Sequence, residues 1–342
     1  MRSVLMLVDY KGDFYSSRRL PYVSMDIPRL REEFRRLDVE LDIRSFTDLE
    51  FRDSSLTGRP VLYQSSEDHH LHYKSFIEDM VLGLTLANAF VIPKYEYLRA
   101  HHNKVFLEVL RDLLPIPELK TISGRTFGTL EEFRSRAASL KYPVVIKPSA
   151  GATSSGVTLA TDRTTAVAAA RRISRTFYPV DGAKEIVKSL IRSYHKRRSH
   201  HRHKFVAQEF VAGLKGDFKV LVYGEKYFVL SRRNRDNDFR ASGSGKFQFN
   251  KELPEGLLDT CRRIYVALDV PFLSIDIAGS AGHFAAFEWQ FLSFGNYTLE
   301  QSPFHFTHDR GAWSCVDGRV VLEAEFATSV TSYVERKLGV RW

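Results

Sequence analysis

Short apolar runs alternate with amphipathic stretches through the first hundred residues, and this alternation constrains the fold more than any other feature of the sequence. Strand-like runs occupy residues 3–8, 41–45 and 60–64, whereas apolar residues recur at helical spacing over 27–37 and 73–87. A helix between successive strands allows those strands to pair in parallel. The N-terminal part is therefore predicted to be an α/β layer with a parallel sheet.

Beyond residue 100 the pattern changes to one dominated by strands. A helix over residues 104–114 is predicted to end at Pro115 and Pro117, because proline cannot continue it. Further helices are predicted over 164–175 and 256–267. Strands are predicted at 143–148, 157–160, 205–211, 218–224, 226–230, 272–278 and 284–290.

The length of 342 residues predicts about two to three packed units, and we place three. These are an N-terminal α/β domain at 1–98, a central lid at 99–205 with a basic insert at 184–204, and a C-terminal catalytic sheet domain at 206–342. The content of 44% hydrophobic and 27% charged residues argues against an intrinsically disordered chain. The longest apolar run, 80–93, is too short to span a membrane, and the N-terminal run lacks a cleavage pattern, so we expect a cytoplasmic protein.

The net charge of +9 comes mostly from one segment. Residues 184–204 contain eight Lys and Arg residues and a single acidic residue, Glu185. Because the rest of the chain is almost neutral, nucleic acid is not the expected partner. We expect residues 195–204 to be a disordered surface insert, and docking to an acidic or phosphate-bearing partner is the alternative.

A Gly- and Ser-rich loop follows a strand that ends near Lys147. The chain has neither the G-x-x-x-x-G-K-[ST] motif nor an early G-x-G-x-x-G, but residues 149–156 read SAGATSSG. Successive backbone N–H groups of such a loop can surround an anion. An ordinary strand-to-strand turn has the same composition, and both readings stay open.

Oxygen ligands gather in the last predicted hairpin. Asp276 lies in an apolar strand, and Glu288 and Gln290 lie two residues apart on the partner strand, so their side chains share a face. Mg²⁺ prefers such oxygen ligands together with nucleotide phosphates. A polar pair on an exposed sheet face is the alternative. Burial of an unpartnered carboxylate would be costly, which favours a cation beside Asp276.

A third segment, Gln208-Glu209-Phe210-Val211, ends a strand and is followed by Asp217. Such an edge can bind adenine, and the carboxylate can accept hydrogen bonds from ribose hydroxyls.

These motifs, over residues 103–296, resemble in content and order the ATP-grasp carboxylate ligases, in particular glutathione synthetase and the ribosomal-protein glutamate ligases. The resemblance implies an ATP-grasp fold with an N-terminal parallel-sheet domain, a lid and a catalytic sheet domain, with ATP between the last two. It implies phosphate-binding roles for Lys104, Lys147 and the loop residues Ser149, Gly151, Ser154, Ser155 and Gly156. It also implies adenine binding by Gln208, Glu209, Phe210 and Val211, ribose binding by Asp217, and magnesium binding by Asp276, Glu288 and Gln290. Arg232, Arg233 and Arg240 resemble residues near the transferring phosphate, and Lys219 stands where relatives commonly carry Arg. Gln290 departs from the usual Asn.

The implied activity is ATP- and Mg²⁺-dependent joining of a carboxylate to an amine through an acylphosphate. Charge on the phosphoryl group must be neutralised, which explains the lysines, arginines and metal ligands together. The carboxylate is expected to be a small molecule or carrier-bound, and a homodimer is left open. Two alternatives remain: a phosphotransferase that stops at phosphorylation, and an inactive polyanion- or nucleic-acid-binding protein.

Two N-terminal loops are candidates for substrate binding. One carries Glu67, Asp68, His69, His70 and His72, and the other follows the first strand over residues 10–19. Ligands of open α/β sheets bind beyond the carboxyl ends of the strands, where both loops are predicted to lie. Arg18 and Arg19 have the chemistry to bind a carboxylate, but a solvated surface loop is the favoured interpretation of residues 10–19. At the histidines, polar loop surface is the alternative to substrate binding, and a transition-metal site is a less favoured one.

Overall fold

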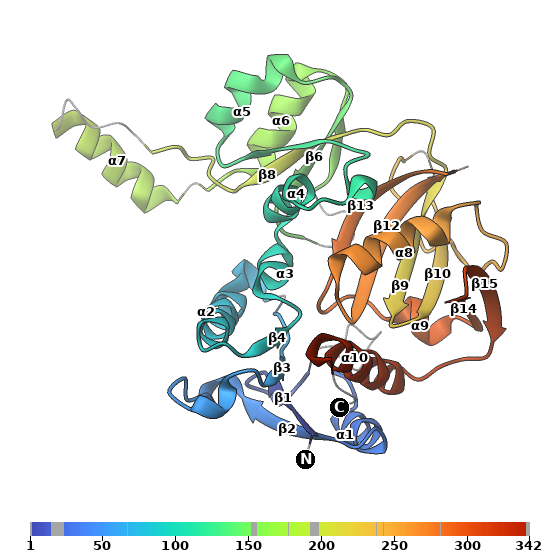
Figure 1. Cartoon of the computed structure of the whole chain (residues 1–342). Helices are drawn as coiled ribbons and strands as arrows, with labels where there is room; N and C mark the ends of the chain where they lie inside the picture. Colours follow the sequence, from blue (N-terminus) through green and yellow to red (C-terminus); the bar gives the residue numbers. More distant parts are fainter. Residues whose placement is uncertain are drawn as a thin grey trace. The chain divides into compact units, whose positions relative to one another are not determined.

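The computed structural model describes residues 2–14, 24–66, 68–151, 156–176, 178–191, 198–236, 238–241, 243–280 and 282–339 (Figure 1). The chain divides into two compact units. One comprises Met1–His101 together with Lys215–Trp342, and the other comprises His102–Leu214. The three-part division at residues 98 and 205 stays a prediction.

The N-terminal sheet is parallel, as predicted, with the strand order β2-β1-β3-β4. Its strands are β1 (Arg2–Val8), β2 (Val39–Ser45), β3 (Pro60–Leu62) and β4 (Phe90–Ile92), and its helices are α1 (Ile27–Arg36), α2 (His72–Leu86) and α3 (Tyr95–Ala100).

The central strand β1 is buried on both faces. Val4 and Met6 belong to one hydrophobic cluster with Phe34 of α1, whereas Leu5 and Leu7 belong to another with residues of α2. Successive side chains of a strand point to opposite faces, so one continuous apolar run supplies both clusters.

The same unit contains a large antiparallel sheet with the order β13-β12-β9-β10-β14-β15, and β11 pairs with β10 (Figure 1). Its strands are β9 (Gly216–Tyr223), β10 (Lys226–Arg233), β11 (Phe247–Gln248), β12 (Phe272–Ser280), β13 (His283–Gln290), β14 (Phe304–Asp309) and β15 (Ala312–Asp317). Its helices are α8 (Leu257–Leu268), α9 (Tyr297–Gln301) and α10 (Leu322–Leu338).

Helix α10, which was not predicted, joins the two sheets of this unit. Phe326, Val330 and Val334 lie in one cluster with Val4 of the N-terminal sheet and Leu221 of the antiparallel sheet. Their spacing of four residues places them on one helix face. The unit therefore has a hydrophobic core shared between segments far apart in the sequence.

The second unit, residues 102–214, has an antiparallel sheet with the order β5-β8-β6-β7. Its strands are β5 (Gly124–Phe127), β6 (Val144–Pro148), β7 (Thr158–Ala160) and β8 (Phe205–Glu209), and its helices are α4 (Lys104–Leu113), α5 (Leu130–Arg136), α6 (Arg163–Ile173) and α7 (Pro179–Ile191). Phe127, Phe133 and Phe205 pack against one another in its core. Short 3₁₀ helices lie at Phe46–Asp48, Ser54–Leu56, His69–Leu71, Pro117–Leu119 and Ala137–Ser139.

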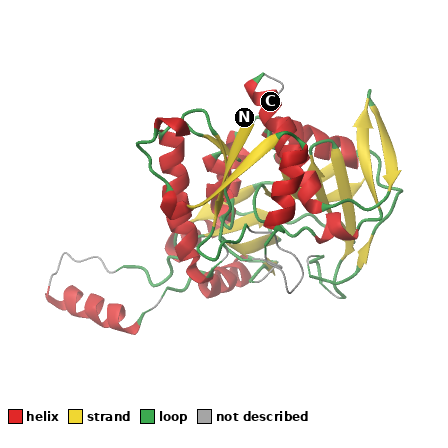
Figure 2. Ribbon diagram, turned by 90° about the horizontal axis from the view of Figure 1, so that it is seen from below, coloured by secondary structure: helices red, strands yellow, loops and turns green. Residues whose placement is uncertain are grey.

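The expectation of a disordered insert covers residues 195–204, of which the structure describes 198–204, and backbone hydrogen bonds join that part to residues 174–176. Residues 184–191 belong to α7, which lies apart from the sheet of its unit (Figures 1 and 2). After it, Thr176 N donates to His200 O at 2.7 Å and His203 N donates to Ser174 O at 3.0 Å. These backbone hydrogen bonds tie the segment to residues 174–176 regardless of its charge. Residues 192–197 lie outside the described residues.

None of the described helices combines the length and the apolar composition that a bilayer crossing requires.

Candidate functional site

Charged and polar side chains gather on one face of the antiparallel sheet, where four neighbouring strands run side by side (Figure 1). Asp276 of β12 is in register with Glu288 of β13 on one side and with Lys219 of β9 on the other. In the next pairing, Asp217 of β9 faces Arg232 of β10. Residues opposite each other in antiparallel strands share a face, so all five side chains lie on the same surface. We call this set the polar face.

Arg232 is at the centre of the polar face and is 7% exposed. Its Nε and Nη2 atoms donate to the two carboxylate oxygens of Asp217 at 2.6 and 2.8 Å, and Nη2 also lies 3.1 Å from Oδ2 of Asp276. Lys219 Nζ lies 3.5 Å from Oδ1 of Asp276 and donates to Ser274 Oγ at 3.0 Å. Two carboxylates and two cations thus form one charge network, which the bidentate fork of an arginine suits.

The network separates the pKa values of its two carboxyl groups. Burial alone would raise the pKa of Asp276, but Arg232 and Lys219 outweigh burial and lower it to about 2. Burial raises the pKa of Asp217 against the pull of Arg232, and the Asp276 charge adds to that rise. Burial acts to lower the pKa of Arg232, but Asp276 and Asp217 raise it. Asp276 is therefore ionised at neutral pH.

The predicted hairpin is formed by β12 and β13, and the three residues predicted to bind magnesium lie on these two strands. Glu288 lies opposite Asp276, and Gln290 lies opposite Ser274. The register shifts between Asp276 and Ile277, which marks a β-bulge next to Asp276. Two carboxylates and one amide oxygen are thus on one face, while among the described residues no group of three His, Cys, Asp or Glu side chains could hold a metal. Glu67 and the side chain of His69 lie outside the described residues, so the transition-metal site at residues 67–72 stays an untested alternative.

The other predicted arginines lie at different places. Arg233 is the last residue of β10 and is exposed. Arg240 forms an ion pair with Asp238 two residues away, with 2.6 Å between Nη2 and Oδ2. The contacts of Arg240 are thus within its own loop, whereas Arg232 is part of the polar face.

Asp217 was expected to bind ribose. In the structure both of its carboxylate oxygens accept hydrogen bonds from Arg232. A ribose contact through these atoms would compete with that ion pair, so the ribose role stays a prediction.

In the second unit, Lys147 starts a buried chain of side-chain contacts. Lys147 Nζ donates to Gln208 Oε1 at 2.5 Å, and Gln208 Nε2 donates to Glu108 Oε1 at 2.8 Å. Glu108 also accepts from Arg111 Nε at 2.9 Å. Burial lowers the pKa of Arg111, against the opposing charge of Glu108. Glu108 and Arg111 were not among the predicted site residues, although their i, i+3 spacing on one helix allows their side chains to pair.

The start of the Gly- and Ser-rich loop is held by residues at the N-terminus of α4. Lys104 Nζ donates to Gly151 O at 2.9 Å, and Lys104 N donates to Ser149 O at 2.8 Å. Ser149 Oγ is hydrogen-bonded to Asn103 Oδ1 at 3.1 Å. Gly156, the last residue of the loop, has a φ of +72°, a conformation that favours glycine. Ser154 and Ser155 lie outside the described residues.

The predicted adenine segment runs from β8 into the following loop. Gln208 is buried, and Glu209 at the strand end accepts hydrogen bonds from Ser123 N and Oγ at 3.3 and 3.2 Å. Phe210 and Val211 follow the strand and are half-buried. The backbone of Glu209 donates to Ser123 O at 2.8 Å.

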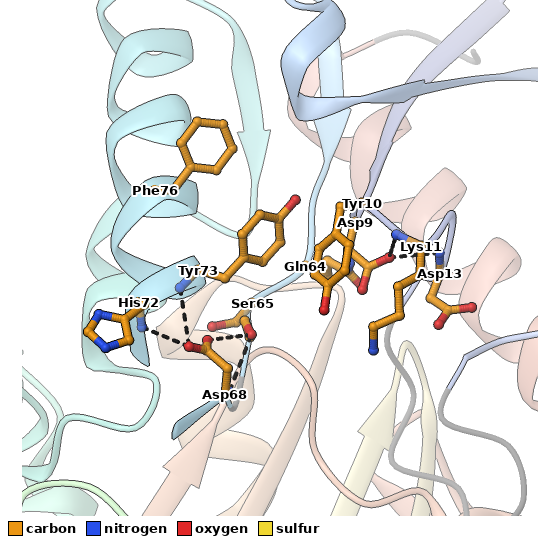
Figure 3. A pocket seen from close by; sticks show the side chains of 11 residues that line it. Asp9, Tyr10, Lys11, Asp13, Gln64, Ser65, Asp68, His72, Tyr73 and Phe76 are labelled. Atoms are coloured by element: carbon orange, nitrogen blue, oxygen red, sulfur yellow. Dashed lines mark hydrogen bonds between the residues drawn. The ribbon is translucent and has the colours of Figure 1, made fainter. Parts of the chain in front are cut away.

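A cavity of about 580 Å³ lies at the carboxyl edge of the N-terminal sheet, and Figure 3 shows its lining side chains. The loop after β1 contributes side chains between Asp9 and Asp13, and the loop after β3 contributes those between Gln64 and Asp68. Helix α2 contributes His72, Tyr73 and Phe76. The chain passes from β1 to β2 on one side and later returns to β3 on the other, so the cavity lies at the point where the strand order reverses. The prediction that both loops face the same space is confirmed for their described residues, whereas Arg18 and Arg19 lie outside them.

No family model and no curated protein matches the sequence. Solved structures match along nearly the whole chain. A D-cycloserine synthetase has 14% identity and a TM-score of 0.52, covering 98% of this chain and 99% of that one. A RimK domain ATP-grasp protein from Sphaerobacter thermophilus has 15% identity and a TM-score of 0.50, with 96% and 99% covered.

A RiPP-associated ATP-grasp ligase from Chryseobacterium gregarium, in complex with ADP and a leader and core peptide, has 11% identity and a TM-score of 0.52, with 98% and 97% covered. These similarities confirm the fold that the motifs predicted. The chain has the ATP-grasp fold.

Proposed function

We propose that this protein is an ATP- and Mg²⁺-dependent ligase that joins a carboxylate to an amine. The observation that carries the proposal is the pairing of Asp276 with Glu288 on a sheet face that also holds Arg232 and Lys219. Partly buried carboxylates beside fixed cations suit a site where phosphate charge is bound and transferred.

The polar face fits magnesium. Mg²⁺ commonly binds through one or two carboxylates, with phosphates and water completing its shell. Asp276 and Glu288 would supply the carboxylates and Gln290 an amide oxygen, and the low pKa of Asp276 keeps its carboxylate ionised. The metal would neutralise charge on the nucleotide phosphates.

The remaining residues have roles that follow from their charges. Lys219 and Arg232 would bind the transferring phosphoryl group, and Arg233 and Arg240 would assist from the exposed strand end and loop. In the second unit, Lys104, Lys147 and the backbone of residues 149–156 would bind nucleotide phosphates. Residues 208–211 would bind adenine. The contacts of Asp217 support a role in positioning Arg232.

In the proposed reaction a substrate carboxylate oxygen attacks the γ-phosphorus of ATP, and the bond to the β–γ bridging oxygen breaks to release ADP. The amine nitrogen then attacks the carbonyl carbon of the acylphosphate, loses a proton to solvent, and displaces phosphate. This chemistry needs positioning and charge stabilisation and no side-chain nucleophile.

The test is ADP release with Mg-ATP and mixtures of amino acids, peptides and sugar acids. Hydroxylamine in the assay traps an acylphosphate as a hydroxamate. A hydroxamate that depends on both ATP and the acid supports the ligase. No Mg-ATP binding and no ADP release would refute it.

One protein of similar fold was solved in complex with a leader and core peptide, so a peptide is one candidate for the substrate that carries the carboxylate. ADP release with a stable phosphorylated product and no hydroxamate would favour the phosphotransferase alternative.

A further inference from the structure

Among its described lining residues, the N-terminal cavity has more acidic than basic side chains. Asp9, Asp13 and Asp68 line it, against the single ammonium of Lys11 among its described lining residues. A cavity that concentrates negative charge favours a cation and repels a carboxylate. Of the two substrates of the proposed ligase, the charge of this cavity therefore favours the amine, as its ammonium ion, over the carboxylate.

The three carboxylates differ in how much of their bonding capacity is used. Asp68 accepts from His72 N and Tyr73 N at 2.8 and 3.3 Å, so it holds the first turn of α2. Asp9 Oδ1 accepts from Lys11 N and Asp13 N at 2.8 and 3.0 Å. Among the described residues, no hydrogen bond or ion pair engages the side-chain carboxylate of Asp13. Asp13 and the second oxygen of Asp9 can therefore meet a ligand cation.

Aromatic rings lie beside these carboxylates. Tyr10 and Tyr73 pack edge to face with centroids 5.2 Å apart, and Tyr73 stacks on Phe76 at 5.7 Å. Tyr10 is 72% exposed. The faces of such rings attract ammonium groups and also bind apolar groups. Figure 3 shows that the rings and the Asp9 carboxylate lie around the same space.

Ser65 supplies an independent sign of a ligand. The residue lines the cavity and is 2% exposed, and its Oγ has no hydrogen-bond partner among the described residues. A buried hydroxyl without a partner is unfavourable, so such a group is expected to bind a ligand atom.

We propose that this cavity binds the amine substrate as its ammonium ion, next to an apolar or aromatic group. The assignment to the amine depends on the ligase proposed above, whereas the binding of an organic ammonium does not. Asp9 and Asp13 hold the cation, Tyr10 and Tyr73 contact the apolar group, and Ser65 Oγ bonds a polar atom of the ligand. The carboxylate substrate binds elsewhere.

The test compares two probes of matched shape on the full chain without nucleotide. 2-Phenylethylamine carries the ammonium, and 3-phenylpropionate carries a carboxylate in its place. Binding is followed by ligand-observed NMR and calorimetry at pH 7. We expect the amine to bind and the carboxylate not to bind.

Three variants localise the effect. Asp13→Asn should weaken binding of 2-phenylethylamine by about fivefold, as for a partly exposed ion pair. The double variant Asp9→Asn/Asp13→Asn should lose more than about tenfold. Ser65→Ala should not lower thermal stability, because the hydroxyl has no partner in the free protein. The control Asp79→Asn removes an exposed α2 carboxylate outside the cavity and should change nothing.

Preferential binding of 3-phenylpropionate, no binding of either probe, or equal effects of Asp13→Asn and Asp79→Asn would each overturn the proposal. Mg-ATP binding is measured separately on the same samples. A protein that binds the amine but not Mg-ATP would refute the ligase function while leaving the ammonium site in place.

Discussion

The polar face of the antiparallel sheet and the N-terminal cavity differ in how their charges are used. On the polar face, Asp217 and Asp276 are neutralised by Arg232 and Lys219, within a closed network. In the cavity, the charges of Asp9 and Asp13 have no cation fixed against them among the described residues. A neutralised network is preorganised for chemistry common to many substrates, whereas an uncompensated cavity can select one substrate.

The largest expected effect is loss of catalysis from the polar face. Asp276→Asn and Glu288→Gln each remove a carboxylate charge with little change in volume. We expect ADP release to fall by at least about a hundredfold, because the charge of the metal would no longer be balanced. The circular dichroism spectrum should stay unchanged. Either variant turning over at the parent rate would contradict the metal assignment.

The next effect is on stability. Arg232→Met leaves two partly buried carboxylates, Asp217 and Asp276, without their shared cation and should lower the free energy of unfolding by about 3–5 kcal/mol. Lys219→Met, in the same network but with Arg232 retained, should cost clearly less. Urea titrations measure both. Equal losses would mean that Arg232 does not hold the network together.

The low pKa of Asp276 predicts the sign of a pH effect. Its stabilisation is present above the unfolded pKa of about 3.8 and is lost as the pH falls toward its folded value of about 2. Acid unfolding of Asp276→Asn should therefore show a smaller loss of stability between pH 4 and pH 2. An identical pH dependence in the variant would contradict the assigned shift.

A smaller effect is expected for nucleotide binding by the second unit. Lys147→Ala should weaken Mg-ATP affinity by about tenfold, since one charge-assisted contact is lost. Lys141→Ala should not, because Lys141 precedes the strand that ends at Pro148. Calorimetry with a non-hydrolysable nucleotide compares the two. Matching losses would count against the phosphate role of Lys147.

A change of a few-fold in one Michaelis constant should distinguish the role of the cavity from that of the polar face. Tyr10→Ala removes an exposed ring and should raise the KM of the amine substrate about threefold while leaving the KM of ATP unchanged. An unchanged KM of the amine, or equal rises in both constants, would remove the contrast between the two regions.

The smallest effect is expected from the basic segment. Replacement of five basic residues of this segment by Ser should leave turnover of a small substrate unchanged. The five are Lys196, Arg197, Arg198, Arg202 and Lys204. A loss of activity at low salt that disappears at high salt would instead indicate an anionic polymer or carrier.

Sequence reasoning located much of the sheet structure but not all of its partners. The two-residue spacing of Glu288 and Gln290 placed both side chains on one face of the strand paired with the Asp276 strand, and the structure confirms this. By contrast, β14, β15 and α10 were missed, as was the role of Glu108. Local spacing was present for Glu108 and for α10, but the partners against which all these elements pack lie far away in the sequence, and no local pattern identifies them.

What the sequence determined by itself was local: side-chain period set which residues share a face, and proline and glycine set where elements end. The tertiary structure decided which residues of other strands lie beside them on that face. Insertion of β9 between β12 and β10 brings Lys219 and Arg232 beside Asp276, and the return of the chain to β3 brings Ser65 beside Asp9. Strand order depends on burying α10 and both sheets in a common core, a requirement that no short window of sequence contains.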